Sequence, residues 1–154
     1  SVRIPLIIYG AGHVPRGVQH DALIGAIDMV PTLCGLAGIP APEGCAGKDY
    51  SGVVMNGEIP PERDAQFIMH IAKDNASKGN AHPVPIFRGV RTARYTYAEG
   101  PEGPMCLFDN QADPYQMKNL VGEADYATER AALQRQLAVW LKRAADPFTS
   151  SANR

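Results

Sequence analysis

The chain has 154 residues, of which 45% are apolar, and this size and composition fit an ordinary globular domain with a sizeable buried core. Its 15 basic and 16 acidic side chains give a formal net charge of -1, which excludes a broad basic surface for nucleic acid or acidic lipid. No apolar run approaches the ~20 residues that a membrane-spanning helix requires, so we expect neither a membrane nor a nucleic acid as partner.

The cysteines do not define a site. Cys34, Cys45 and Cys106 are odd in number and widely spaced, and no Cys-x-x-Cys pair is present to bind zinc. We interpret them as small buried or half-buried thiols, with a single disulfide as the alternative. The sequence shows no basic leader and no signal-type cleavage site, so the compartment, periplasmic or cytoplasmic, is left open.

The chain opens with a short apolar run, Pro5–Tyr9, which is followed by glycines. This pattern is typical of a strand that is covered on both faces, and such strands usually lie in a parallel sheet with several neighbours. No other segment has the same character. We therefore expect the chain to begin inside a larger fold, as a fragment or excised subdomain.

A helix is predicted over Asp28–Gly38, after a loop at Ala11–Gly17. Asp28 is expected to cap its first turn by accepting a backbone hydrogen bond, and Pro31 lies within that turn, where a missing N–H costs little. Gly38 provides a left-handed exit from the helix. The segment Glu43–Arg63 is rich in glycine, proline, Asp and Asn, which indicates a connecting excursion.

Four short patterns predict a small antiparallel sheet in the second half of the chain. These patterns are Gln66–Ala72, Ile86–Arg91, Arg94–Ala98 and Met105–Phe108, and the last two are separated by the turn Gly100–Pro104. Phe87, Tyr95 and Tyr97 share one parity, so a regular pleat is expected to place them on a common face.

The longest helical pattern closes the chain at Thr128–Ala145, with an apolar stripe of Leu133, Leu137, Trp140 and Leu141. The fold class is α+β, with a small antiparallel sheet of about four strands packed on this long C-terminal helix. A strand and a helix precede it as the remnant of a larger α/β domain. We expect one unit over residues 1–63 and a second over 64–154.

Histidines and lysines around a polar loop, Lys73–Pro85, provide the only candidate binding site. His70, Lys73, Lys78 and His82 could line a recognition loop for an anionic substrate, and a solvated loop without function is the alternative. No histidine has a partner at i+2, i+3 or i+4, so we predict no metal site. His13 and His20 are interpreted as surface residues.

Other charged residues are interpreted as structural. Asp109 and Asp113 lie in a turn-forming stretch where carboxylates fold back onto backbone N–H groups, so we expect caps and not an acid–base pair. Arg88 and Arg94 share one parity and Arg91 has the other, so no continuous anion stripe is expected. Neither a Gly-x-Ser-x-Gly elbow nor a phosphate-binding loop is present.

Three linked stretches resemble the late part of the sulfatase family, within the alkaline-phosphatase-like superfamily. The first is the apolar run with Ala26–Pro40, which contains Asp-x-x-Pro-Thr-Leu followed by Leu-Ala-Gly-Ile-Pro. The second is Arg88–Tyr97, which is similar to Arg-x-Val-Arg-Thr-x-Arg-Tyr-x-Tyr, and the third is Leu107–Leu120, in which Phe108 replaces the usual Tyr. The resemblance covers nearly the whole chain in order.

This resemblance implies a parent enzyme that hydrolyses sulfate esters with a formylglycine and a divalent cation, usually calcium. The formylglycine arises in a Cys/Ser-x-Pro-x-Arg motif, and none of the three cysteines or the serines lies in such a motif. No catalytic residue and no metal ligand transfers to this chain. The fragment alone is therefore expected to be inactive, to support the missing N-terminal catalytic domain and to wall its substrate cleft through Lys73–Pro85.

Two alternatives remain open from the sequence. The first alternative is the tail of a related phosphate or phosphonate ester hydrolase of the same superfamily, because these motifs do not report the nucleophile. A stand-alone binding or assembly module is the other alternative. An excised piece should also expose apolar surface, so we expect a homo-oligomer or a displaced N-terminal segment.

Overall fold

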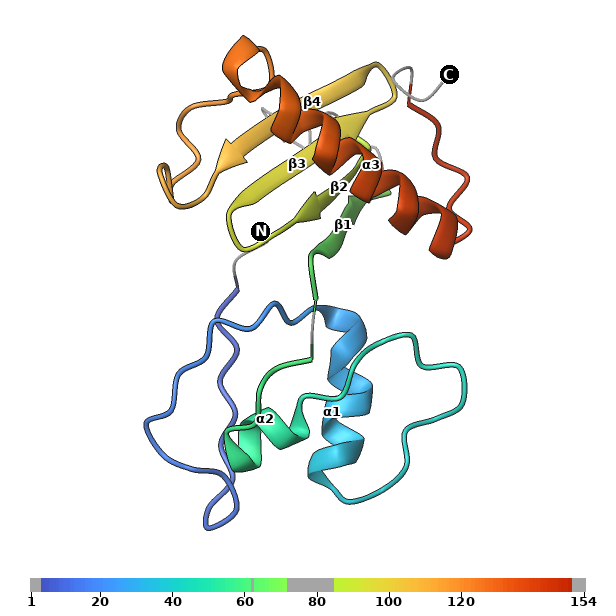
Figure 1. The fold of residues 1–154 in the computed structure, drawn as a ribbon. Helices are drawn as coiled ribbons and strands as arrows, with labels where there is room; N and C mark the ends of the chain where they lie inside the picture. Colours follow the sequence, from blue (N-terminus) through green and yellow to red (C-terminus); the bar gives the residue numbers. More distant parts are fainter. Residues whose placement is uncertain (1–3, 62, 72–84, 151–154) are drawn as a thin grey trace, which may run out of the picture. The chain divides into compact units, whose positions relative to one another are not determined.

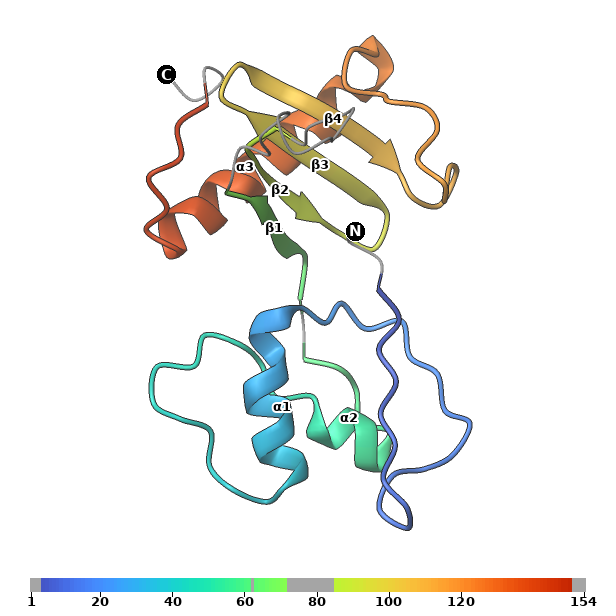
Figure 2. The same cartoon turned by 180° about the vertical axis from the view of Figure 1, so that it is seen from behind.

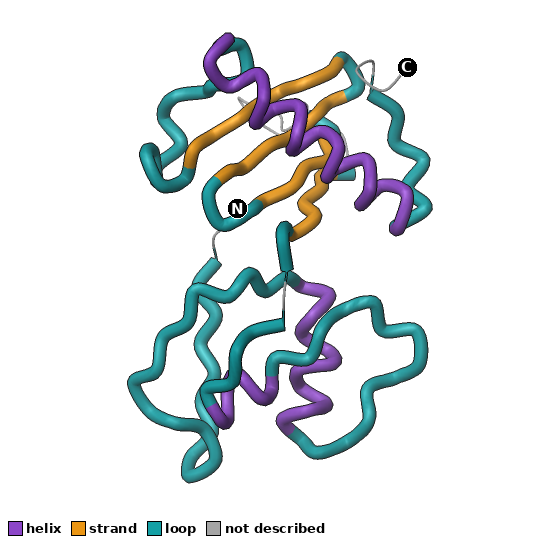
Figure 3. The backbone as a smooth tube through the Cα atoms, viewed as in Figure 1, coloured by secondary structure: helices purple, strands orange, loops and turns teal. Residues whose placement is uncertain are grey.

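The computed structural model describes residues 4–61, 63–71 and 85–150, and the chain divides into two compact units, Ser1–Asp64 and Ala65–Arg154. The first unit contains short helices and long loops, whereas the second contains a sheet and a long helix (Figures 1 and 3). In the described part of the chain, no helix is both long and apolar enough to cross a membrane.

The first unit is built on two helices. The short 3-10 helix η1 (Ala26–Asp28) leads directly into α1 (Met29–Leu36), and α2 (Ser51–Asn56) follows a long loop. α1 ends as the sequence predicts, because Gly38 has a φ of 68° and the N–H of Ile39 donates to the carbonyl of Cys34 at 3.0 Å. This arrangement satisfies carbonyls at the end of the helix.

The strand predicted for Pro5–Tyr9 is wrong for this structure, in which residues 4–10 have no regular secondary structure. A strand requires a hydrogen-bonded neighbour, and the described residues of the first unit contain no strand. The apolar side chains are consequently exposed, with 87% of Ile7 and 79% of Tyr9 open to solvent. The segment therefore has the apolar composition of a buried strand, but its side chains are not buried in this structure.

The second unit contains the predicted four-stranded antiparallel sheet. Its strands are β1 (Gln66–His70), β2 (Phe87–Arg91), β3 (Tyr95–Gly100) and β4 (Gly103–Asp109), and they pair in the order β1-β2-β3-β4. All three pairings are antiparallel, and a register shift between Ala98 and Glu99 interrupts the β3–β4 ladder. Figure 2 shows the four strands from the side opposite the helix.

The predicted C-terminal helix covers one face of this sheet. The 3-10 helix η3 (Ala124–Tyr126) leads into α3 (Ala127–Arg143), which runs diagonally across the strands (Figure 1). Leu133 and Leu137 are buried, and Trp140 stacks on Phe67 with ring centroids 6.2 Å apart. The core consists of Ala65, Val90, Tyr97, Leu107, Leu120, Leu133 and Leu137.

The register corrects one expectation about the aromatic residues. Val90 pairs with Tyr97 and Arg88 pairs with Glu99, so even-numbered residues of β2 share a face with odd-numbered residues of β3. Phe87 therefore lies on the face opposite to Tyr95 and Tyr97, and the predicted common face is wrong. Residues with the same odd or even numbering on neighbouring strands share a face only when the register of the pairing aligns them.

The loop that follows β4 returns along the outer edge of that strand. The side chain of Asn119 accepts a hydrogen bond from the N–H of Leu107 at 3.0 Å and donates to the carbonyl of Met105 at 2.9 Å. The N–H of Leu120 donates to the carbonyl of Leu107 at 2.8 Å. This loop thus satisfies backbone groups that an edge strand would otherwise expose.

Candidate functional site

His70 is the one residue of the predicted recognition loop that the structure describes. It is the last residue of β1, where it pairs with Phe87, and its imidazole stacks on the Phe87 ring with centroids 6.1 Å apart. Its Nδ1 lies 3.2 Å from the carbonyl oxygen of Pro85. The carbonyl can only accept, so Nδ1 is the donor in this hydrogen bond.

The other residues predicted for this site, Lys73, Lys78 and His82, lie outside the described residues. Their proximity to His70 stays a prediction. The remaining histidines, His13 and His20, are exposed on the loop that follows the apolar run in the first unit. No group of three metal-binding side chains occurs within residues 4–61, 63–71 and 85–150.

The side chain of Arg88 lies beneath this end of β1. Its Nε donates to Asp146 Oδ2 at 2.7 Å and its Nη2 to Asp146 Oδ1 at 3.2 Å, which is a bidentate ion pair. Its Nη1 donates to the carbonyls of Phe87 at 3.0 Å and His70 at 3.3 Å. The side chains of Arg88 and Asp146 are only 9% and 10% exposed.

The C-terminal segment after α3 completes the environment of Arg88. The ring of Phe148 lies 5.0 Å from the centre of its guanidinium, and the N–H of Phe148 donates to Asp146 Oδ1 at 2.9 Å. The hydrogen bonds from Arg88 hold the pKa of Asp146 below its ordinary value, with a smaller contribution from that N–H. No pattern in the sequence connects Arg88 and Asp146, because β3, β4 and α3 lie between them along the chain.

Asp109 and Asp113 have the structural roles that the sequence predicts. Asp109 is 1% exposed and accepts hydrogen bonds from Arg94 Nε at 3.0 Å and Nη2 at 2.9 Å, as well as from the N–H groups of Gln111 and Ala112. Asp113 accepts the N–H of Lys118 at 2.8 Å. The hydrogen bonds from Arg94 hold the pKa of Asp109 below its ordinary value, so its side chain is held in the deprotonated form.

A polar cluster on the sheet face opposite α3 was not predicted. Arg91 and Gln116 both donate to the hydroxyl of Thr96 and to Asn110 Oδ1, over distances of 2.7–3.1 Å. Gln116 has a φ of 56°, a left-handed conformation that is uncommon for a residue other than glycine. The cluster joins β2, β3 and the loop after β4, and the Arg91 that the sequence singled out is part of it.

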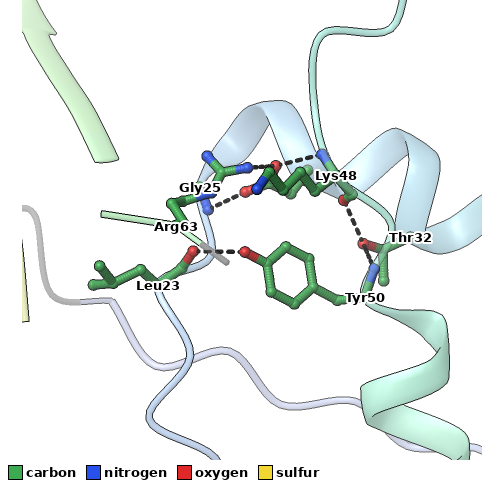
Figure 4. A network of polar contacts seen from close by, with 7 residues as sticks. Leu23, Gly25, Thr32, Lys48, Tyr50 and Arg63 are labelled. Carbon is green, nitrogen blue, oxygen red and sulfur yellow. Dashed lines mark hydrogen bonds and ion pairs between the residues drawn. The ribbon is translucent and has the colours of Figure 1, made fainter. Parts of the chain in front are cut away.

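The first unit has a polar network of its own, in which Gly25, Lys48 and Arg63 converge (Figure 4). They surround Asp28, which is fully buried. Its Oδ2 accepts the N–H of Gly25 at 2.7 Å, and its Oδ1 accepts the N–H of Lys48 at 2.8 Å and a guanidinium N–H of Arg63 at 2.6 Å. Asp28 makes no capping bond to α1. The predicted cap is wrong, because the carboxylate turns toward three other segments of the unit.

Thr32 and Tyr50 extend this network. The N–H of Tyr50 donates to the Thr32 hydroxyl at 3.1 Å, and the phenol of Tyr50 donates to the carbonyl of Leu23 at 3.0 Å (Figure 4). Burial raises the pKa of Tyr50, and the nearby Arg63 opposes this effect. The motif Asp-x-x-Pro-Thr thus anchors the long loop between α1 and α2.

An apolar surface of the first unit is open. The groove between the apolar run and α1 is lined by Leu6, Ile7, Ile8, Tyr9, Ile24, Met29, Thr32, Leu33 and Leu36. Leu33, on α1, is 57% exposed. The three thiols are free, with Cys34 and Cys106 half-buried and Cys45 exposed.

The carboxylates of Asp28, Asp109 and Asp146 all accept structural hydrogen bonds. His70 is the described residue that combines partial burial with a titratable ring at the end of a strand. Its imidazole can take part in hydrogen bonds through both ring nitrogens, and Nδ1 already contacts the Pro85 carbonyl.

Known proteins are similar to this chain over nearly its whole length. A family model described as "N-sulphoglucosamine sulphohydrolase, C-terminal" matches residues 1–143. An ulvan-active sulfatase of Formosa agariphila is 36% identical over 151 residues, which cover 97% of this chain and 29% of that protein. The chain thus spans less than a third of the length of this relative.

Two solved structures have the same fold. A 2-O GAG sulfatase superimposes with a TM-score of 0.66 at 26% identity, covering 77% of this chain and 25% of that one. A phosphonate monoester hydrolase of Agrobacterium radiobacter superimposes with a TM-score of 0.57 at 26% identity, covering 75% and 24%. Both likenesses extend over about a quarter of the other protein.

Proposed function

The chain belongs to the family of N-sulphoglucosamine sulphohydrolase C-terminal regions, and from this membership we propose that it is the C-terminal portion of a sulfuric ester hydrolase. The observation that carries the proposal is the family match over residues 1–143, together with a sulfatase relative that is 36% identical over 97% of the chain. The resemblance seen in the three sequence motifs is thereby confirmed. The activity itself is assigned to a longer protein, because the chain covers 29% of that relative.

The chemistry of the longer protein would require groups from outside this chain. A sulfatase is expected to use a formylglycine as nucleophile and calcium or another divalent cation as Lewis acid. The described residues contain no group of three metal-binding side chains that fits such a cation. We assign both the cation and the nucleophile to the remaining part of the protein, and we expect the 154-residue chain alone to be inactive.

For the first unit we propose that it packs on this catalytic region as an edge of its α/β domain. The support is the groove between Pro5–Tyr9 and α1, whose apolar side chains are exposed in the chain by itself. Pairing of Pro5–Tyr9 with a strand would satisfy its backbone and cover these side chains. Self-association of the isolated chain is the alternative way of covering them.

For the second unit we propose that the end of β1 faces the substrate cleft, with His70, Lys73 and His82 as substrate-binding residues. His70 supports this proposal because its ring is held between Phe87 and the Pro85 carbonyl. The test is to replace His70 and His82 with Ala in the longer protein, with the exposed His20→Ala as a control. A raised KM in the double variant supports the assignment, and unchanged KM and kcat would exclude it.

The structural similarity to a phosphonate monoester hydrolase supports a second candidate function, which is hydrolysis of phosphate or phosphonate esters. The decisive experiment is to express the longer reading frame and compare hydrolysis of an aryl sulfate with that of an aryl phosphonate monoester. Faster sulfate release supports the first function, and faster phosphonate cleavage supports the second. If neither ester is cleaved, a binding or assembly module becomes the better description.

A further inference from the structure

We infer that Arg88 and Asp146 are positioning residues that set the orientation of the His70 imidazole from the opposite face of the sheet. This inference rests on the proposed function only in treating His70 as a substrate-binding residue. The contacts among Arg88, Asp146 and His70 do not depend on that role. Each step of the connection is a contact that the structure shows.

The first step is the fixed geometry of the guanidinium. Arg88 uses its planar fork in two directions, toward the carboxylate of Asp146 at 2.7 and 3.2 Å and toward the carbonyls of Phe87 and His70 at 3.0 and 3.3 Å. A planar guanidinium presents its donors at fixed angles, so the position of the carboxylate dictates where Nη1 points. Asp146 therefore acts on the carbonyl of His70 through Arg88.

The second step is burial, which makes this geometry rigid. The two side chains are 9% and 10% exposed, and the Phe148 ring covers the guanidinium at 5.0 Å. A buried charge that loses its partner is strongly destabilised, so the guanidinium has no low-energy alternative position. Glu99, the residue opposite Arg88 on β3, lies on the same face and is also fully buried.

The third step connects the backbone of His70 to its ring. Because His70 and Phe87 form the last pair of the β1–β2 ladder, the Arg88 bond to the His70 carbonyl fixes the strand where its pairing ends. The imidazole lies on the other face, stacked on Phe87 and bonded through Nδ1 to Pro85. With both anchors in place, the ring has one orientation, in which Nδ1 donates to the Pro85 carbonyl.

The backbone after α3 is shaped to deliver Asp146 to this position. Ala145 has a φ of 47°, and the N–H of Asp146 donates to the carbonyl of Leu141 at 3.1 Å. Left-handed backbone at a residue other than glycine is unfavourable and persists where the surroundings determine it. The turn at Ala145 directs the chain back toward β2, and the ion pair with Arg88 holds it there.

The test uses the 154-residue chain with labelled histidine and follows the ring nitrogen and carbon resonances of His70 by NMR. We expect Asp146→Asn to shift these resonances and to reduce the Nδ1-protonated tautomer, and Phe148→Ala to produce a smaller shift in the same direction. The control is Asp125→Asn, which removes an exposed carboxylate before α3 and should leave His70 unchanged. Circular dichroism confirms that each variant retains its fold.

Unchanged His70 resonances in folded Asp146→Asn and Phe148→Ala variants would overturn the inference. Should Asp146→Asn fail to fold, Arg88→Lys decides instead, because it keeps the positive charge beside Asp146 but lacks the planar fork that also reaches the His70 carbonyl. This readout does not depend on sulfate or phosphonate hydrolysis. If the proposed function fails, the NMR result on His70 still stands. If the NMR result fails, the proposed function is still open to its own test.

Discussion

The phenol of Tyr97 donates a 2.7 Å hydrogen bond to Glu99 Oε1, and both side chains are fully buried. The two residues are i and i+2 on β3, so they share the face that α3 covers. A carboxylate in such a place requires hydrogen bonds or an opposite charge, and its partner across the ladder is Arg88. The interface between sheet and helix is thus apolar at one end and polar at the other.

Removal of the phenol should therefore destabilise the second unit. We expect Tyr97→Phe to lower the free energy of unfolding by about 1–3 kcal/mol, because a buried carboxylate loses a donor while the packed volume is kept. Urea unfolding followed by Trp140 fluorescence measures this change. The matched control is Tyr115→Phe at a residue that is 86% exposed, and an equal loss in both variants would contradict the argument.

The same pair predicts the behaviour of the protein in alkali. Burial, then the hydrogen bond to Glu99 and its charge, raise the pKa of Tyr97 far above its ordinary value of 10.0. An unfolded tyrosine ionises near that value, so the contribution of Tyr97 to stability is complete below it and is lost as the pH rises further. Unfolding free energies measured from about pH 8 to about pH 11 should fall, and Tyr97→Phe should flatten this decline.

Asp109 predicts the opposite dependence in acid. The hydrogen bonds from Arg94, followed by those from the N–H groups of Ala112 and Gln111, hold the pKa of Asp109 below its ordinary value of 3.8. Its contribution to stability is present above that value and is lost as the pH falls through the lower pKa of the folded state. We expect Asp109→Asn to destabilise the protein at neutral pH and to weaken the fall in stability below about pH 4.

The control for this prediction is Asp113→Asn in the same loop. Asp113 accepts one backbone N–H, which an Asn side chain can also accept, so its stability profile should follow that of the unaltered protein. The side chain of Arg94 is 54% exposed, so added salt should reduce part of the Asp109 effect. An acid profile of Asp109→Asn indistinguishable from the unaltered chain would refute the assignment.

Ala145 predicts a stabilising substitution. Its φ of 47° is left-handed, which disfavours a residue with a Cβ. We expect Ala145→Gly to raise the free energy of unfolding by up to about 1 kcal/mol. Ala144, next to it, has right-handed helical angles, so Ala144→Gly should have the opposite sign, and thermal unfolding of the two variants tests the pair.

Asp28 predicts the stability of the first unit. Its side chain is 0% exposed and that of Arg63 is 5% exposed, so Arg63→Met leaves a buried carboxylate without its charged partner. We expect a loss of about 3–5 kcal/mol, seen as disappearance of the protected amide protons of Gly25 and Lys48 in hydrogen exchange. Asp21→Asn, at an exposed position of the same unit, should leave both amides protected.

Local sequence patterns predicted most helices and strands, because these elements depend on residues that are close together in the sequence. The stripe of Leu133, Leu137 and Trp140 has helical period, and α3 buries the two leucines and stacks the Trp on Phe67. The left-handed exit at Gly38 was predictable because glycine favours that backbone. The pairings β2–β3 and β3–β4 were predictable as antiparallel because their connections are too short for a crossover.

Relations between strands were less accessible from the sequence. Phe87 shares parity with Tyr95 and Tyr97 but lies on the other face, because the register pairs even with odd positions between β2 and β3. Asp28 has the sequence position of a helix cap, yet its carboxylate accepts from Lys48 and Arg63, which only the folded loops bring near. The apolar run Pro5–Tyr9 has strand composition but lacks the hydrogen-bonding neighbour that a strand requires.

The sequence by itself determined the family, the α+β class and the near-absence of catalytic motifs, since these depend on residue types at short spacing. Only the tertiary structure decided that Arg88 reaches Asp146, that Tyr97 protects Glu99 and that His70 is held from both sides. Such contacts join residues on different elements or depend on burial. Their energies come from the fixed positions of buried charges, which no local pattern encodes.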